Sequence, residues 1–155
     1  MKKAIIKTIE TQSHWLYAAL LLLLLPLLAS CEKEPINRNI EGHWRLEQFT
    51  IHETKETVTC ERIFWGITRV GAKLIEKQGP HGYPSLDALV EYRNDETIFV
   101  LKDIRLGDRK TKPTPEQMHP YGLNNASESI FRVLQSTHKE MVLESDYARL
   151  EFRKF

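Results

Sequence analysis

Side chains that commonly act in catalysis or metal binding occur in this sequence without forming a recognisable site. Zinc sites and catalytic sites need cysteine, histidine and carboxylate side chains at characteristic spacings. The histidines after residue 30 are scattered without such spacing: His43, His52, His81, His119 and His138. The sequence has no glycine-rich phosphate loop, no His-Glu-x-x-His pair and no nucleophile elbow. We therefore expect no catalytic residue, no metal, no cofactor and no enzymatic activity.

Cys31 is the side chain whose sequence context most clearly predicts chemistry. It follows an uninterrupted apolar run from Leu16 to Leu25 and then the segment Leu28-Ala29-Ser30. The apolar run has a length typical of a secretory signal, and small residues before the cysteine fit the narrow cleft of a peptidase. A membrane-spanning helix needs about 20 apolar residues. The pattern therefore favours a signal peptide over a transmembrane anchor.

The segment Leu28-Ala29-Ser30-Cys31 resembles the lipobox of bacterial lipoproteins. The resemblance implies that residues 1–30 are a signal peptide removed before Cys31, and that Cys31 is the lipidation site. Its sulfur would carry diacylglycerol and its new amine would be acylated. Two or more acyl chains hold a protein stably at a membrane. We therefore expect a lipoprotein of the bacterial cell envelope, anchored by its N-terminal lipid, with the outer membrane as the expected location.

The chain that remains after cleavage is long enough for one domain with a single core. The formal net charge of +1 becomes −1 because the leader carries three lysines and one glutamate. A nucleic-acid partner would require a clustered positive surplus, so we expect none. Cys60 has no disulfide partner within the chain once Cys31 carries lipid, and we expect it to be a small buried apolar residue.

Positions 31–39 are mostly polar and predict a flexible tether from the lipidated Cys31. The folded domain is therefore expected to span residues 40–155. There, apolar and polar residues alternate as in strands with one buried face. The alternation changes phase near Gln48, which predicts a bulge in the first strand. The expected strands cover residues 44–51, 57–70, 73–76, 89–92, 97–104, 131–133, 140–144 and 148–153.

One short helical turn is expected near residues 115–119. Thr114 can cap this turn, Pro115 suits the first helical position, and Gln117 can return a hydrogen bond to the cap residue. Pro120 and Gly122 would end the turn. Short strands joined by local connections predict an all-β protein. The expected architecture is an antiparallel meander that closes into a small barrel of about eight strands, because closure removes exposed strand edges.

Gly42-His43-Trp44, in a small meander that ends in Leu150-Glu151-Phe152-Arg153, resembles the lipocalin-like lipoproteins of bacteria over residues 40–155. In lipocalins a Gly-x-Trp opens the barrel, and an arginine of the last strand covers the indole. The resemblance implies a lipocalin-like barrel with Gly42 and Trp44 as signature residues. It also implies that Arg149 or Arg153 lies over Trp44, and the position near the strand end favours Arg153. Guanidinium groups stack well on indole rings.

Two functions are compatible with these features. The domain could bind a small apolar or amphipathic molecule near the membrane, or it could be a packed interaction protein displayed to an envelope partner without a small-molecule ligand. A barrel of eight strands can be filled by its own side chains or can hold one small ligand. Bulky residues expected inside favour a filled barrel: Trp44, Leu46, Trp65, Met141, Leu143, Leu150 and Phe152. The sequence predicts no ligand-binding residue, and the interior volume decides between the two functions.

Overall fold

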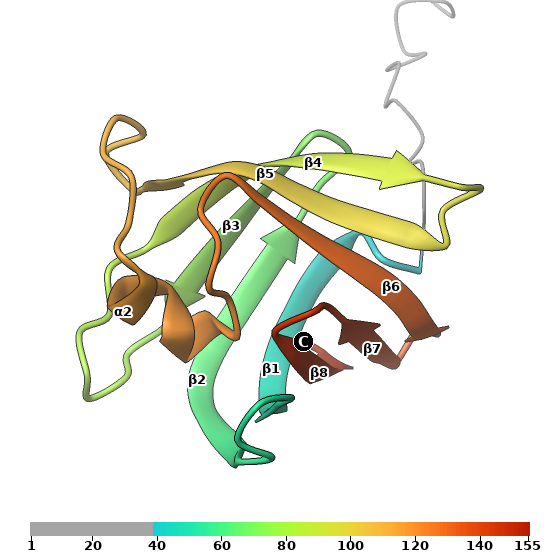
Figure 1. The fold of residues 1–155 in the computed structure, drawn as a ribbon, viewed down its shortest axis with the longest axis horizontal. Helices are drawn as coiled ribbons and strands as arrows, with labels where there is room; N and C mark the ends of the chain where they lie inside the picture. The colour runs from blue at the N-terminus through green and yellow to red at the C-terminus, as the bar shows by residue number, and fades with distance from the viewer. Residues whose placement is uncertain (1–38) are drawn as a thin grey trace, which may run out of the picture. The chain divides into compact units, whose positions relative to one another are not determined.

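The computed structural model describes residues 39–155, so the expectations for the signal peptide, for Cys31 and for most of the tether lie outside the described residues. Eight strands form a closed antiparallel barrel in which each strand pairs with the next and β8 pairs with β1 (Figure 1). The strands are β1 Gly42–Ile51, β2 Thr57–Ile67, β3 Gly71–Glu76, β4 Leu86–Arg93, β5 Ile98–Leu106, β6 Glu128–Ser136, β7 Glu140–Glu144 and β8 Ala148–Lys154. The predicted all-β meander closing into a barrel is confirmed.

Alternation of apolar and polar residues explains which side of each strand faces the core. In β8, Ala148, Leu150 and Phe152 are buried, while the residues between them face outward. The bulge predicted near Gln48 is also confirmed. The register of β1 shifts between Leu46 and Gln48 against both β2 and β8. The shift lets the two halves of β1 bury residues of opposite parity against one core.

The predicted strand over residues 57–70 extends too far at its C-terminal end. The structure ends β2 at Ile67, because Thr68 makes a tight turn. Its backbone N–H and its hydroxyl each donate a hydrogen bond to the carbonyl of Gly71, both at 2.8 Å. Val70 lies in this turn and is 68% exposed. Conversely, β4 begins at Leu86, earlier than expected, since the alternating core positions already start there.

The expected helical turn is present as α2 (Pro115–Met118), which continues as the 3₁₀ turn η2 (His119–Tyr121). The backbone N–H of Thr114 donates to Oε1 of Gln117 at 2.9 Å, as the predicted capping box requires.

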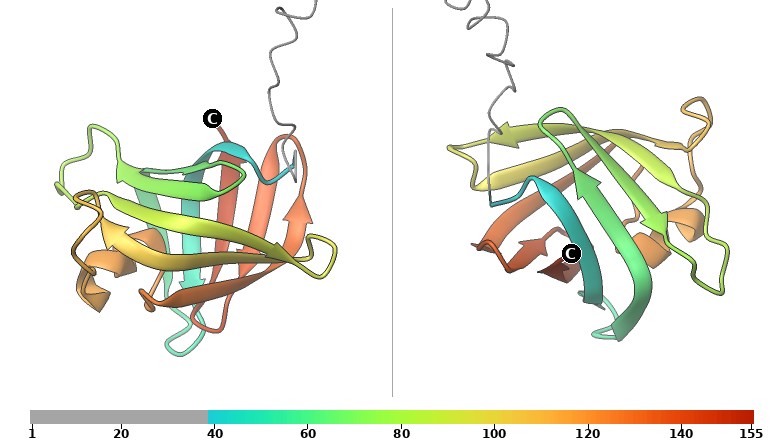
Figure 2. Two further views of the ribbon diagram at one scale, coloured as in Figure 1. Left: turned by 90° about the horizontal axis from the view of Figure 1, so that it is seen from above. Right: turned by 180° about the vertical axis from the view of Figure 1, so that it is seen from behind.

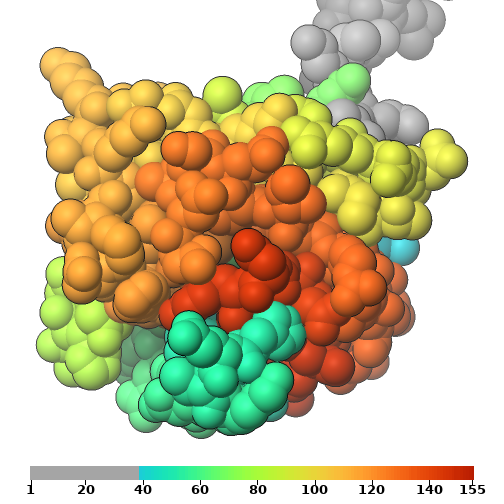
Figure 3. Space-filling view, viewed as in Figure 1, coloured from blue at the N-terminus to red at the C-terminus, as the bar shows by residue number. Residues whose placement is uncertain are grey.

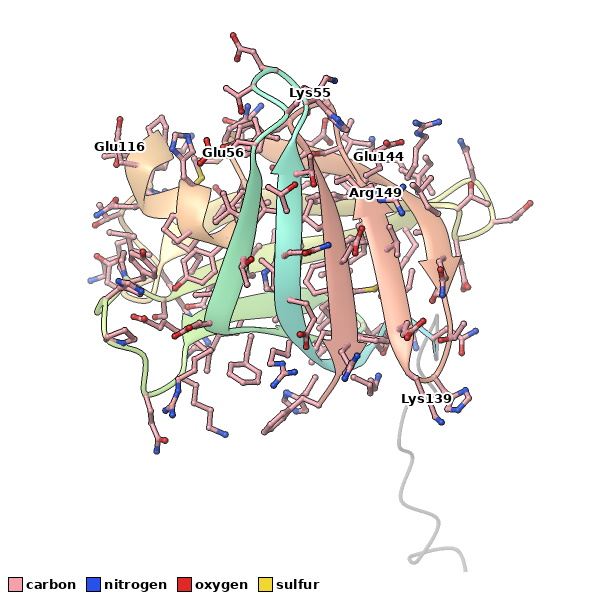
Figure 4. The ribbon with its side chains drawn as sticks, turned by 90° about the horizontal axis from the view of Figure 1, so that it is seen from below. Lys55, Glu56, Glu116, Lys139, Glu144 and Arg149 are labelled. Atoms are coloured by element: carbon pink, nitrogen blue, oxygen red, sulfur yellow. The ribbon has the colours of Figure 1, made fainter. Side chains whose placement is uncertain are left out.

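Lys55 and Glu116 lie at one end of the barrel, and Lys139 lies at the other (Figure 4). We call these the helix end and the C-terminal end. No helix within residues 39–155 is long and apolar enough to cross a membrane.

Within residues 39–155, eight strands close into a barrel around one buried core. A closed barrel needs no further strand to pair its edges. The experiments on soluble protein below therefore use residues 39–155.

Candidate functional site

The interior of the barrel is the first place to look for a ligand site, and it is filled by side chains from every strand. A set of these side chains has no solvent-accessible surface: Trp44, Leu46, Trp65, Leu74, Leu86, Phe99, Leu101, Ile104, Phe131, Met141, Leu143, Ala148 and Leu150. These side chains pack together in one hydrophobic core. The bulky residues expected inside the barrel are all buried there.

Trp65 lies among aromatic rings in this interior. The rings of Phe131 and Phe152 meet its indole edge-on, at centroid distances of 6.0 and 5.0 Å. Such T-shaped pairs are favourable beyond the area they bury. The Trp65 Nε1–H has no hydrogen-bond acceptor among residues 39–155. The interior is thus closely packed around one unpaired donor.

Trp44 closes the C-terminal end of the barrel. Its Nε1 donates a hydrogen bond to the carbonyl of Ile40 at 2.6 Å, and Ile40 is itself fully buried. The Lys154 ammonium lies 4.2 Å from the centre of the indole ring and donates to the carbonyl of Glu41 at 2.8 Å. Burial lowers the pKa of Lys154 from its ordinary value. Together these contacts hold the residues before β1 over the end of the barrel.

The expectation that Arg149 or Arg153 covers Trp44 is wrong. In the β1–β8 ladder Trp44 lies opposite Lys154, whereas Arg153 lies opposite Arg45. Successive residues of a strand face opposite sides, so Arg153 faces solvent and Lys154 faces Trp44. Lys154 shares the parity of the buried residues of β8, and this parity is the sequence signal that could have identified it.

Gly42 is the signature residue that makes this contact possible. Its φ of +132° lies in a region that side chains rarely adopt. A Cβ at this position would lie 2.3 Å from Nζ of Lys154. A larger residue here would therefore displace the ammonium from the Trp44 ring.

The segment of α2 and η2 closes the helix end. Its buried side chains are Met118 and Tyr121, followed by Leu123. The Tyr121 hydroxyl donates to the carbonyl of Pro84 at 3.0 Å, and burial raises the pKa of Tyr121 to about 12. In the space-filling view, this segment forms part of the light orange surface on the left, next to the deeper orange of later residues (Figure 3). Both ends of the barrel are thus covered by the chain's own residues.

A groove of about 490 Å³ lies on the outer face of β2 to β5. We call it the outer groove, lined mainly by Gly66, Val70, Gly71, Lys73, Asp87 and Leu89. These positions alternate with buried core residues, such as Leu74 beside Lys73 and Leu86 beside Asp87. The groove is therefore separated from the barrel interior by the sheet. The right-hand view of Figure 2 shows β2, β3 and β4 from behind.

Charged side chains surround one half of the outer groove. One row of directly opposite residues crosses adjacent strands and contains Gly66, Lys73, Asp87 and Arg105. Arg105 is paired with Asp103 at 2.6 Å, and the Arg109 Nε lies 3.8 Å from Oδ2 of Asp87. The side chain of Lys73 makes no hydrogen bond or ion pair with any residue that the structure describes. The groove thus offers one uncommitted ammonium group.

The residues considered for catalysis or metal binding remain apart. Within residues 39–155 no three histidine, cysteine or carboxylate side chains could together hold a metal ion. His52 contacts the carbonyl of Ser145 at 3.1 Å, while His81 stacks on Tyr83 and His119 on Tyr147. These three histidines therefore have separate local contacts.

Cys60 is expected to be unreactive. It is half-buried on β2, and burial, followed by the nearby charge of Glu47, raises the pKa of its thiol to about 12. The thiolate is the reactive form. At pH 8 we expect folded residues 39–155 to react with iodoacetamide more than about a hundredfold more slowly than the urea-unfolded chain, which has an ordinary cysteine pKa. Equal rates for the two states would show an exposed, ionisable thiol.

Comparisons with known proteins agree with this architecture. A family model described as a lipocalin-like domain matches residues 26–155. A crystal structure of a lipocalin-like protein from Bacteroides uniformis superposes with a TM-score of 0.58 at 14% identity, over 76% of this chain and 99% of that one. A crystal structure of an uncharacterized protein from Bacteroides eggerthii gives 0.56 at 15% identity, over 74% and 98%. Curated proteins give no match. At these identities the likeness to solved structures concerns the fold alone.

Proposed function

Since the chain belongs to the lipocalin-like domain family, we propose that it is a lipid-anchored protein of the bacterial envelope whose packed barrel binds its partner through the outer surface. The proposal gives the protein no catalytic step. A shared fold does not fix a shared binding mode. The proposal therefore rests on the particular residues of this barrel.

The filled interior is the observation that carries the proposal. Core side chains without accessible surface occupy the barrel, Trp44 and Ile40 cover one end, and Tyr121 lies within the segment that covers the other. A ligand inside would have to displace several of these side chains. Each displaced large side chain would lose contacts of about 2–5 kcal/mol. Recognition at the outer surface requires no such rearrangement.

A ligand inside the barrel is the second candidate, and one observation favours it. The unpaired Trp65 Nε1–H is buried, and such an unpaired donor typically costs about 1–3 kcal/mol. A ligand with an acceptor oxygen would relieve that cost. The relief is smaller than the loss of packing that entry would require, so we favour the outer surface.

Tryptophan fluorescence separates the two candidates, because Trp44 and Trp65 are the only tryptophans of residues 39–155 and both are fully buried. We expect acrylamide to quench their emission poorly. Saturating apolar and amphipathic molecules, such as retinol or decanoate, should leave the emission spectrum unchanged. A ligand-dependent shift or quenching that saturates at one molecule per protein would contradict the proposal, since it would place the ligand beside the indoles.

Membrane anchoring is supported by the leucine-rich run followed by Leu28-Ala29-Ser30-Cys31. We expect protein extracted from membranes to begin at Cys31 and to carry the mass of its acyl chains. A Cys31→Ser protein should lose that mass and move to the soluble fraction, because lipid provides the anchor. Cys60→Ser is the matched control and should remain in the membrane. Unchanged partition of the Cys31→Ser protein would refute lipid anchoring.

A further inference from the structure

We propose that the outer groove binds a single-chain anionic amphiphile, with its carboxylate at Lys73 and its alkyl chain along Val70 and Leu89. The inference rests on the proposed function in one respect, because it takes the outer surface of the barrel as the binding surface. It adds the place on that surface and the chemistry of the ligand.

The hollow exists because two outward positions lack side chains. Gly66 lies on the outer face of β2 between Trp65 and Ile67, which point into the core, and Gly71 begins β3 directly before the buried Ala72. A Cβ on Gly66 would reach to 3.4 Å from the His43 ring, and one on Gly71 would reach to 3.4 Å from the Ala88 carbonyl. Any larger residue at these positions would therefore occupy the space. The volume of about 490 Å³ falls within the range of small-molecule sites, about 300–1,000 Å³.

Two exposed apolar side chains border the end of the groove near the β2–β3 turn. Val70 is 68% exposed and Leu89 is 59% exposed. They are neighbours in space, because Gly71 lies opposite Leu89 and the carbonyl of Val70 accepts a hydrogen bond from Val90 at 3.0 Å. Single exposed apolar residues are common, but two that adjoin a cavity form a surface that a hydrocarbon chain can cover.

The other end of the groove carries charge. Lys73 and Asp87 each lie two residues along their strands from Gly71 and Leu89, which is about 6.6 Å at the rise of a strand. Among the five charged lining residues, Lys73, Arg105 and Arg109 outnumber Asp87 and Asp103. The lining of the groove therefore carries a formal net charge of +1. The charge pattern complements a ligand with one negative charge.

The ion pairs of the groove leave Lys73 as the cation available to a ligand. Asp103 pairs with Arg105, and Asp87 lies near Arg109, whereas the Lys73 ammonium group has no ion-pair partner among residues 39–155. An ammonium beside a partly enclosed surface forms stronger hydrogen bonds with a carboxylate than with neutral groups. A carboxylate at Lys73 would place a straight alkyl chain over Gly71, toward Val70 and Leu89.

Decanoate, kept monomeric below its micelle concentration, is the probe that tests this proposal on residues 39–155. We expect a saturable change in the ¹H–¹⁵N NMR signals of Gly66, Gly71, Lys73 and Leu89. Decyltrimethylammonium, which has the same chain and the opposite charge, should bind at least about fivefold more weakly because it meets the positive surplus. Binding of the cation alone would assign the site to Asp87 and overturn the proposal.

Substitutions test whether the carboxylate of decanoate binds at Lys73 and its alkyl chain binds at Leu89. Lys73→Gln should weaken decanoate binding about fivefold by removing the charge, and Lys112→Gln, which changes the same charge on an exposed loop, should not weaken it. Leu89→Ser should weaken it by a similar factor through loss of apolar contact. Gly71→Val should abolish it by filling the hollow. Melting temperatures of all four variants show whether each remains folded. Lys73→Gln should keep the melting temperature of the unaltered protein, because its side chain lies outside the core.

The outcomes also distinguish this inference from the proposed function. Absence of decanoate binding, with the indole emission unchanged, would overturn the groove ligand and leave the outer-surface proposal intact. Decanoate binding that alters the emission of Trp44 and Trp65, and that Lys73→Gln and Gly71→Val do not affect, would contradict both. Binding to phosphatidylglycerol vesicles that these variants abolish, without binding of decanoate, would assign the groove to a membrane surface and overturn the proposal of a free amphiphile.

Discussion

Replacing Trp44 with alanine is expected to lower the free energy of unfolding by about 3–5 kcal/mol, the usual range for a buried aromatic side chain. The indole is fully buried, accepts the Lys154 ammonium on its face and donates to the Ile40 carbonyl. The substitution removes all three contributions at one end of the barrel. Because a domain has only about 5–15 kcal/mol of stability, much of the variant should be unfolded. Urea unfolding of residues 39–155, followed by circular dichroism, measures the change.

The same substitution identifies the residue that covers the indole. In double-mutant cycles we expect Trp44→Ala to couple with Lys154→Ala by about 0.5–2 kcal/mol, the range of cation–π contacts from exposed to desolvated sites. Arg153→Ala is the matched control, because Arg153 is the neighbouring residue on the outward side of β8. Its effect should add to that of Trp44→Ala without coupling. Coupling to Arg153 and none to Lys154 would mean that the register of β1 and β8 described above is wrong.

Gly122→Ala is expected to lower the free energy of unfolding by about 2–4 kcal/mol, from left-handed backbone strain and overpacking together. Gly122 has a φ of +73°, and a Cβ there would lie 2.8 Å from Cδ2 of Leu150. The new methyl group would push the segment after η2 away from the core. Thermal or urea unfolding of residues 39–155 measures the loss.

Gly82→Ala is the control for Gly122→Ala. Gly82 has a similar φ of +67°, but no heavy atom of residues 39–155 lies within 4 Å of the position of its Cβ. This variant should show only the backbone term, about 1–2 kcal/mol. The difference between the two variants therefore measures how tightly the helix end is closed. Equal losses would mean that the segment does not pack closely on Leu150.

Much of the architecture followed from the sequence because strand alternation depends on near neighbours. The closed meander, the bulge at Gln48 and the capping box at Thr114 were all predicted from local patterns. The end of β2 was misjudged because Val70 is apolar and looked like a strand residue. Its exposure results from the turn that Thr68 forms, and a hydrogen bond within a turn leaves no periodic signal.

The residues that depend on contacts between distant strands were harder to predict. Arg153 was expected over Trp44 because an arginine fits the family pattern, whereas the β1–β8 register brings Lys154 there. The outer groove was not foreseen, because Gly66, Lys73 and Asp87 lie on three strands whose register only the fold determines. The sequence did favour a filled barrel, since its bulky residues fall on the inward parity.

Xenon binding tests the central claim, that the barrel interior is filled, most directly. Xenon enters apolar cavities that exclude water, and an engineered cavity lined by large aliphatic and aromatic residues binds it readily. Crystals of residues 39–155 under xenon pressure should show no xenon inside the barrel, while Trp44→Ala, where it folds, should bind xenon in the space left by the indole. Xenon between Trp65, Phe131 and Phe152 in the unaltered protein would contradict the account, because it would reveal an interior cavity ready for an apolar ligand.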